Sequence, residues 1–169
     1  MKIIQPSDGI IRPNQTEHSL FLVGPTPRVS SVPTWRLDAL GILGEIGYKG
    51  WVYVPEPFAQ QGYEFQIRWE TTALTYVEVI AAWVPRDMAT MPALTTNIEF
   101  GEWFKNDKFV YGRPPTAPNC GYLDERYKYR GYTITGVSEE TTSKFGNKPH
   151  TSLRSLLVAA TAGECERNA

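Results

Sequence analysis

Short apolar runs alternate with helical patterns about five times along this chain, and this alternation constrains the fold more than any other feature. Residues 19–24 (SLFLVG) and 79–84 (VIAAWV) are continuous apolar runs, as expected of strands buried on both faces of a parallel sheet. Strands that alternate with helices predict an α/β fold, with a parallel sheet and helices on both of its faces.

The expected elements can be placed by their boundaries. We expect strands at 19–24, 51–54, 79–84, 109–111 and 132–135, and helices at 35–46, 63–77, 96–104, 122–127 and 151–162, with a broken helical pattern from 138. Residues 1–17 are rich in turn signals and predict a lead-in segment with a short hairpin around 3–4 and 10–11. The whole chain, 1–169, is predicted to be a single domain. Its sheet is expected to be flavodoxin-like (Rossmann-like), with five strands in the order 2-1-3-4-5.

Composition excludes several classes of function. The net charge is −1, so no basic field favours a nucleic-acid polymer. No apolar run is long enough to span a membrane, and the first residues lack the apolar segment of a signal peptide. Two distant cysteines, Cys120 and Cys165, and two histidines form no metal or redox motif. We therefore expect no metal, no cofactor, no membrane partner and a cytoplasmic location.

Glu99 is the first candidate for chemistry, because it follows the buried strand at 79–84 and the loop after it. Ligands of open α/β sheets bind outside the carboxyl ends of the strands. In a structural interpretation, Thr96 and Glu99 form a capping box at the start of a helix. In a functional interpretation, Glu99 is a nucleophile or general base, and a nearby helix N-terminus stabilises its anion. The motif alone favours the first interpretation.

Glu70 is the second candidate. By itself it is an ordinary helical carboxylate, but together with Glu99 it completes a pair. Glycosidic bonds are commonly cut by two carboxyl groups, one a nucleophile and one a proton donor, and the donor needs a raised pKa. Burial beside Trp69 is one way to raise it.

Three further segments could bind a substrate. In the loop after the first buried run, Gly24 and Pro25 allow a close approach of the backbone, and Arg28 could hold an anion. Asp87 and Asn97 could orient a sugar hydroxyl or Glu99 itself, although Asp87 is equally explained by an ion pair within its loop. No dinucleotide fingerprint, phosphate-binding loop or nucleophile elbow is present.

Several of these segments resemble, in order and spacing, the nucleoside 2-deoxyribosyltransferase family, specifically its transferase-like branch. The similar segments cover roughly residues 20 to 125 and are FLVGPTPR (21–28), the helix start Trp35-Arg36, GWVYVPEP (50–57), QIRWETTAL (66–74), IAAWVPRD (80–87), ALTTNIEFG (93–101) and VYGRPP (110–115).

The resemblance implies a flavodoxin-like fold and cleavage of the N-glycosidic bond of a 2'-deoxynucleoside through a covalent sugar–enzyme intermediate. Glu99 corresponds to the family's nucleophilic glutamate, and Glu70 to an aspartate that handles the proton of the base. Gly24 and Pro25 correspond to a loop that shapes the nucleobase site. The family also forms homo-oligomers, dimers or higher, in which a neighbouring subunit completes the site.

Two positions depart from the family pattern. Glutamate stands at position 70 instead of aspartate, and Ala93 stands where better-known members carry an aspartate that contacts the sugar. Three functions follow as expectations: a deoxyribosyltransferase, an N-glycosidase (hydrolase) of 2'-deoxynucleoside 5'-monophosphates in which Arg28 or Arg86 grips the phosphate, and a non-catalytic nucleotide-binding or sensing module. In each case the partner is a small nucleoside or nucleotide.

Overall fold

The computed structural model describes residues 1–14, 16–130 and 144–167. The expected strand at 132–135 and the helical pattern from 138 lie outside the described residues. Within the described part the elements are β1 (Lys2–Ile4), the short 3-10 helix η1 (Pro6–Asp8), β2 (Ser19–Val23), α1 (Trp35–Glu45), β3 (Trp51–Tyr53), α2 (Tyr63–Tyr76), β4 (Val79–Trp83), α3 (Leu94–Trp103), β5 (Phe109–Gly112), α4 (Gly121–Lys128) and α5 (Leu153–Arg167).

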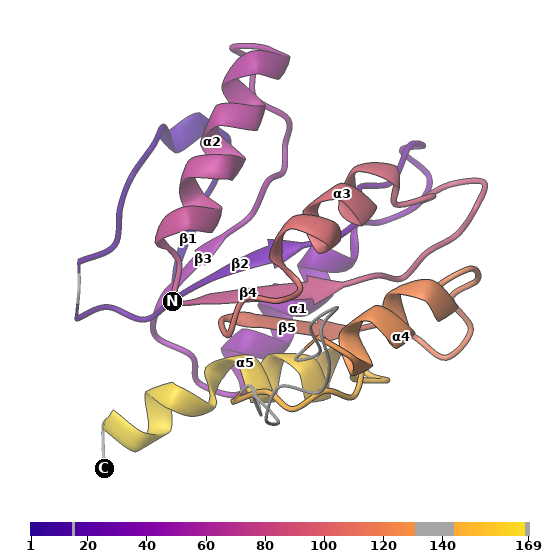
Figure 1. Cartoon of the computed structure of the whole chain (residues 1–169). Coiled ribbons are helices and arrows are strands. Elements are labelled where there is room, and N and C mark those ends of the chain that lie inside the picture. The colour runs from indigo at the N-terminus through magenta and orange to yellow at the C-terminus, as the bar shows by residue number, and fades with distance from the viewer. Residues whose placement is uncertain (15, 131–143, 168–169) are drawn as a thin grey trace.

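Five parallel strands form one sheet in the order β1-β3-β2-β4-β5, which confirms the predicted flavodoxin-like α/β fold (Figure 1). The four expected strands from 19–24 to 109–111 occupy the predicted order. Every residue of β2 and β4 is buried, because helices cover both faces of the sheet and leave no solvated side.

The fifth described strand is β1, at the sheet edge beside β3. Lys2 pairs with Trp51 and Ile4 with Tyr53 in parallel register. The predicted hairpin around residues 3–4 and 10–11 is therefore wrong. The rest of the lead-in segment is held by side chains of the core: Trp69 Nε1 donates to the Gly9 carbonyl at 2.8 Å. Residues 1–14 thus complete the sheet edge and cover α2.

Two apolar layers flank the sheet. On one face, side chains such as Phe21 and Ile80 pack with α2, α3 and α4, and on the other, Leu22 and Ala81 pack with α1 and α5. In Figure 1, α2 and α3 lie above the sheet and α5 lies below it. No helix in residues 1–14, 16–130 or 144–167 has the length and apolar character needed to cross a bilayer.

Candidate active site

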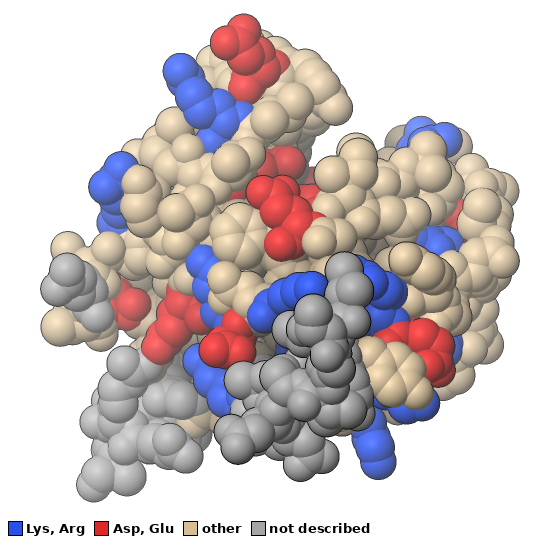
Figure 2. Space-filling view, viewed as in Figure 1, with Lys and Arg blue, Asp and Glu red and all other residues tan. Residues whose placement is uncertain are grey.

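A cavity of about 160 Å³ lies beyond the carboxyl ends of β2, β3 and β4. The chain leaves β2 for β3 on one side, whereas β4 lies on the other side of β2, so this is the topological switch point where such sheets bind ligands. Figure 2 shows acidic side chains gathered in the hollow between α2 and α3. The lining includes five residues that the sequence analysis singled out: Gly24, Pro25, Arg28, Glu70 and Glu99.

The helix that carries Glu99 starts earlier than predicted. α3 begins at Leu94, and its N-cap is Ala93, which has a φ of 60° and makes no side-chain capping bond. Thr96 lies inside the first turn, and its buried hydroxyl has no hydrogen-bond partner among the described residues. The capping-box interpretation is therefore wrong, because neither Thr96 nor Glu99 occupies the position that a capping box requires.

Glu99 faces the cavity from the second turn of α3 and is partly buried. Burial raises the pKa of its carboxyl group to about 8, repulsion from Glu70 adds to this rise, and the cation of Arg36 opposes it. Glu99 lies beyond the first turn of α3, where the effect of a helix N-terminus falls off, and burial opposes the expected stabilisation of its anion.

Glu70 enters the same cavity from α2, and its carboxylate is fixed by a neighbour one turn earlier. Gln66 Nε2 donates to Glu70 Oε1 at 2.6 Å. Gln66 is itself held, because its amide also donates to the carbonyl of Pro55 and accepts from the backbone N–H of Ala59. Burial raises the pKa of Glu70, against the hydrogen bond from Gln66 and the charge of Arg36.

The loop after β2 packs tightly over the strand ends. A Cβ atom on Gly24 would lie 2.2 Å from the carbonyl oxygen of Trp83 and 2.7 Å from Cζ2 of Trp35. The carbonyl of Pro25 accepts a hydrogen bond from Trp35 Nε1 at 3.0 Å. This position requires glycine, because only a residue without a side chain lets the β2 loop approach β4 so closely.

Arg28 lies at the exposed rim of the cavity. Asp87 and Asn97, in contrast, lie outside the cavity lining. The Asp87 carboxylate accepts hydrogen bonds from the backbone N–H of Ala89 and from Thr90 within its own turn. Asn97 Oδ1 accepts from Arg86 Nη2, so sugar binding by Asp87 or Asn97 stays a prediction that this geometry does not favour.

Sequence reasoning did not assign a site role to Arg36, which lines the cavity from the first turn of α1. Its side chain is 2% exposed. Its position in the sequence carries a signal, because Arg36 stands on the buried helical stripe that continues with Ala39 and Leu43. A charged residue on such a stripe needs a buried partner, and here that partner is Glu56 at 2.5 Å.

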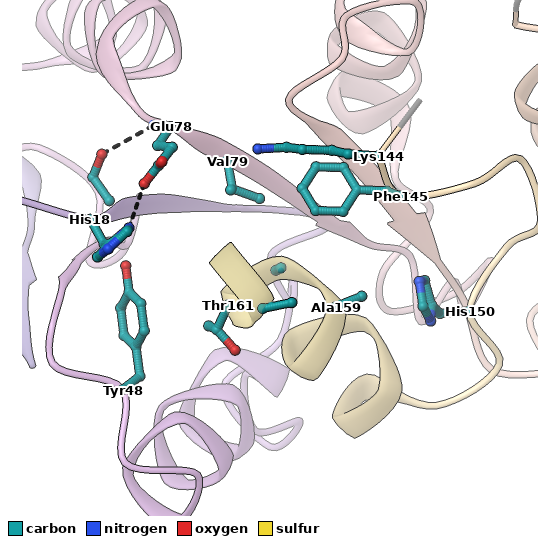
Figure 3. Close-up of a pocket in the computed structure, with 12 residues that line it drawn as sticks. His18, Tyr48, Glu78, Val79, Lys144, Phe145, His150, Ala159 and Thr161 are labelled. Atoms are coloured by element: carbon teal, nitrogen blue, oxygen red, sulfur yellow. Dashed lines mark hydrogen bonds and ion pairs between the residues drawn. The ribbon is translucent and has the colours of Figure 1, made fainter. Parts of the chain in front are cut away.

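Another cavity, of about 360 Å³, lies at the opposite end of the strands, where β2 and β4 begin (Figure 3). Its polar wall includes His18, whose Nδ1 lies 2.7 Å from Glu78 Oε2, and Thr161 comes from α5. We place the candidate site in the smaller cavity, because it lies at the carboxyl ends of the strands and brings two carboxylates together. Among the described residues, no three His, Cys, Asp or Glu side chains cluster as metal ligands.

No protein-family model matches this chain, and no curated protein matches it significantly.

Proposed function

We propose that this chain cleaves the N-glycosidic bond of 2'-deoxynucleosides and transfers the deoxyribosyl group to another nucleobase through a covalent glutamyl–sugar intermediate. The observation that carries the proposal is the pair formed by Glu70 and Glu99, which come from different helices and line one cavity at the switch point of the sheet. The resemblance of residues 20 to 125 to the deoxyribosyltransferase family supports the same assignment.

The pair can supply both the ionised nucleophile and the proton donor that such a reaction needs. The two carboxyl groups repel each other when both are ionised, and burial raises the pKa of each, so the pair resists losing its second proton. Displacement at C1' requires an ionised carboxylate as nucleophile, and departure of the base requires a proton donor.

In the first half-reaction, a Glu99 oxygen attacks C1' while the C1'–N bond breaks and its electrons pass to the base nitrogen. Glu70 gives its proton to the base. Before substrate binds, burial favours the proton on Glu99, whose pKa is about 8. Positive charge that develops at C1' stabilises the Glu99 carboxylate, so the proton moves to Glu70 without changing the charge of the pair.

In the second half-reaction, a nitrogen of the acceptor base attacks C1' and displaces the Glu99 carboxylate, while ionised Glu70 takes the proton of the acceptor. If water enters instead, the product is free deoxyribose. The transfer outcome therefore depends on whether the acceptor base or water reaches the covalent intermediate first.

The first experiment is incubation with deoxynucleosides, with and without an acceptor base, followed by chromatography. We expect base exchange by the wild-type chain and a loss of about a thousandfold or more in Glu99→Gln, because the nucleophile is removed. Glu64→Gln is the matched control: Glu64 lies on α2 but is exposed, and this variant should turn over normally. Full turnover by Glu99→Gln would contradict the assignment.

A second experiment identifies the nucleophile. A 2'-fluorinated deoxynucleoside analogue slows the breakdown of a glycosyl–enzyme ester, so the trapped residue can be located by peptide mass spectrometry. We expect the sugar on the peptide that carries Glu99. A sugar on Glu70 would reverse the roles of the two carboxylates.

A second candidate function is hydrolysis of 2'-deoxynucleoside 5'-monophosphates, and one observation favours it. Arg28 lines the candidate cavity and is exposed, whereas the guanidinium of Arg86 is held by the Asn119 carbonyl and by Asn97. Loss of one charge-assisted contact to a phosphate should raise KM for the monophosphate roughly tenfold in Arg28→Gln. KM for the nucleoside should stay unchanged, and sugar phosphate without base exchange would favour this candidate.

The same measurements test the non-catalytic alternative. A nucleotide-dependent rise in melting temperature with no product from any substrate would indicate a binding module, which the alanine at position 93 makes worth testing. The oligomeric state, a dimer or larger assembly whose neighbouring subunit completes the site, is implied by the family resemblance and can be measured by light scattering.

A further inference from the structure

Arg36 is the buried cation of the candidate site, and its contacts tie three segments together. Its guanidinium donates to three carbonyl oxygens at the end of β2 and in the following loop, those of Leu22, Gly24 and Pro25. It also donates to the hydroxyl of Thr26 at 3.3 Å and forms an ion pair with Glu56, which lies in the loop after β3. The cation is therefore held rigidly beside the cavity.

Negatively charged side chains outnumber positively charged ones around this cation. Glu56 already forms an ion pair with Arg36, yet Arg36 also lines the same cavity as Glu70 and Glu99, so its charge acts on those two carboxylates as well. Among the described residues, the other charged groups in reach are Glu102, which opposes ionisation of Glu99, and Arg28 at the rim. Three carboxylates thus share one buried cation, so the charge of Arg36 affects whether the catalytic pair is ionised.

We propose that Arg36 is a positioning residue which, with Glu56 as its counter-ion, holds the Glu70–Glu99 pair at one negative charge. In this role Arg36 keeps one carboxylate ionised for attack on C1', while the other retains the proton that the base needs. The inference rests on the proposed function for its catalytic meaning, whereas its electrostatic part concerns the protein alone and can be measured without substrate.

The two members of the ion pair have opposite expected effects. Removing the cation in Arg36→Gln leaves burial and repulsion unopposed, so the pKa of Glu99 should rise by about one pH unit or more. Removing the counter-ion in Glu56→Gln leaves the cation less compensated, so the pKa of Glu99 should fall, by roughly half a pH unit. Arg36→Lys keeps the charge and should restore most of the wild-type value.

The experiment is an NMR titration of the 13C-labelled glutamate carboxyl groups, with Glu99 and Glu70 assigned from their glutamine variants. Circular dichroism checks that each variant is folded. Because Arg36 is buried and widely hydrogen-bonded, Arg36→Gln is the variant at risk of misfolding. Glu56→Gln keeps the size of the side chain and an acceptor oxygen, so it tests the predicted direction independently.

Glu45→Gln is the matched control. Glu45 also lies on α1 and pairs with an arginine, Arg154, but both side chains are largely exposed, and its removal should leave the titration of Glu99 unchanged. Unchanged titration in Glu56→Gln and Arg36→Gln, or shifts in one common direction, would overturn the inference.

In active protein the same variants should move the acid limb of the kcat/KM profile: to higher pH in Arg36→Gln and to lower pH in Glu56→Gln. The two proposals fail separately. Shifted carboxyl titrations without glycosidic turnover contradict the proposed function and support the electrostatic role of Arg36. Turnover with unshifted titrations contradicts that role and leaves the proposed function intact.

Discussion

Gly24 is the residue at which the backbone of the candidate site is most restricted. Alanine there would place its Cβ against the carbonyl of Trp83 and the ring of Trp35, and neither the backbone of β4 nor a buried tryptophan can easily move. We expect Gly24→Ala to lower the free energy of unfolding by about 1–3 kcal/mol and to reduce substrate binding, as measured by urea denaturation and by KM.

Gly101→Ala is the matched control for this prediction. Gly101 is an exposed glycine inside α3, and a Cβ added there would meet no described neighbour within 4 Å, so alanine should stabilise the helix by about 0.5–1 kcal/mol. Equal destabilisation by both substitutions would show that the close approach at Gly24 is not what limits that position.

At this scale the sequence predicted the residue types of the site better than their surroundings. Glu99 and the Gly24–Pro25 turn could be selected because they follow apolar runs that mark strands, and Glu70 because its carboxylate could pair with that of Glu99; the structure places all of them at one cavity. The start of α3 could not be predicted, because its N-cap is an alanine in a left-handed conformation, a residue that carries no capping signal. The contacts of Arg36 join segments after β2 and β3, and spacing along the chain does not reveal them.

At the scale of elements, β1 is the strand whose place in the sheet the sequence did not predict, because the expected hairpin paired residues 3–4 with 10–11. It is three residues long, and only Ile4 is buried, so neither an apolar run nor a clear alternation marks it. Its partner, β3, lies about fifty residues further along the chain. The central strands were predictable because burial on both faces demands continuous apolar residues, whereas an edge strand is defined by its neighbour.

The contribution of β1 can be tested by two adjacent substitutions. Ile4 is 1% exposed and packs in the core under α2, whereas Ile3 is 42% exposed. We expect Ile4→Ala to cost about 2–4 kcal/mol of stability, because it leaves a cavity in the core. Ile3→Ala should cost less than about 1 kcal/mol, and both values come from denaturation curves. A similar loss of stability in the two variants would contradict the burial of Ile4 in the core.

At the scale of the whole molecule, the candidate site lowers the stability of a sheet that is otherwise well packed. Burial disfavours the ionised forms of both Glu70 and Glu99, yet the fold holds them together at its switch point. Proteins accept such destabilisation where function requires groups that water would otherwise solvate. The candidate site should therefore set how the stability of the whole chain depends on pH.

Glu99 makes this dependence measurable. Its pKa is raised from 4.5 to about 8 in the folded chain. Between these pH values the folded protein retains a proton that the unfolded chain has released, so the free energy of unfolding falls as pH rises from about 4.5 to 8. Glu99→Gln removes this loss. Its free energy of unfolding, measured by urea denaturation, should exceed that of the wild type by up to about 5 kcal/mol at pH 8. Near pH 4 the two proteins should agree within about 1 kcal/mol, because Glu99 is then protonated in the folded and in the unfolded state.

Glu64→Gln, at an exposed position, should keep the wild-type dependence on pH. A gain in stability of Glu99→Gln that is the same at pH 4 and pH 8 would show that a new hydrogen bond or better packing, rather than removal of the buried charge, accounts for it.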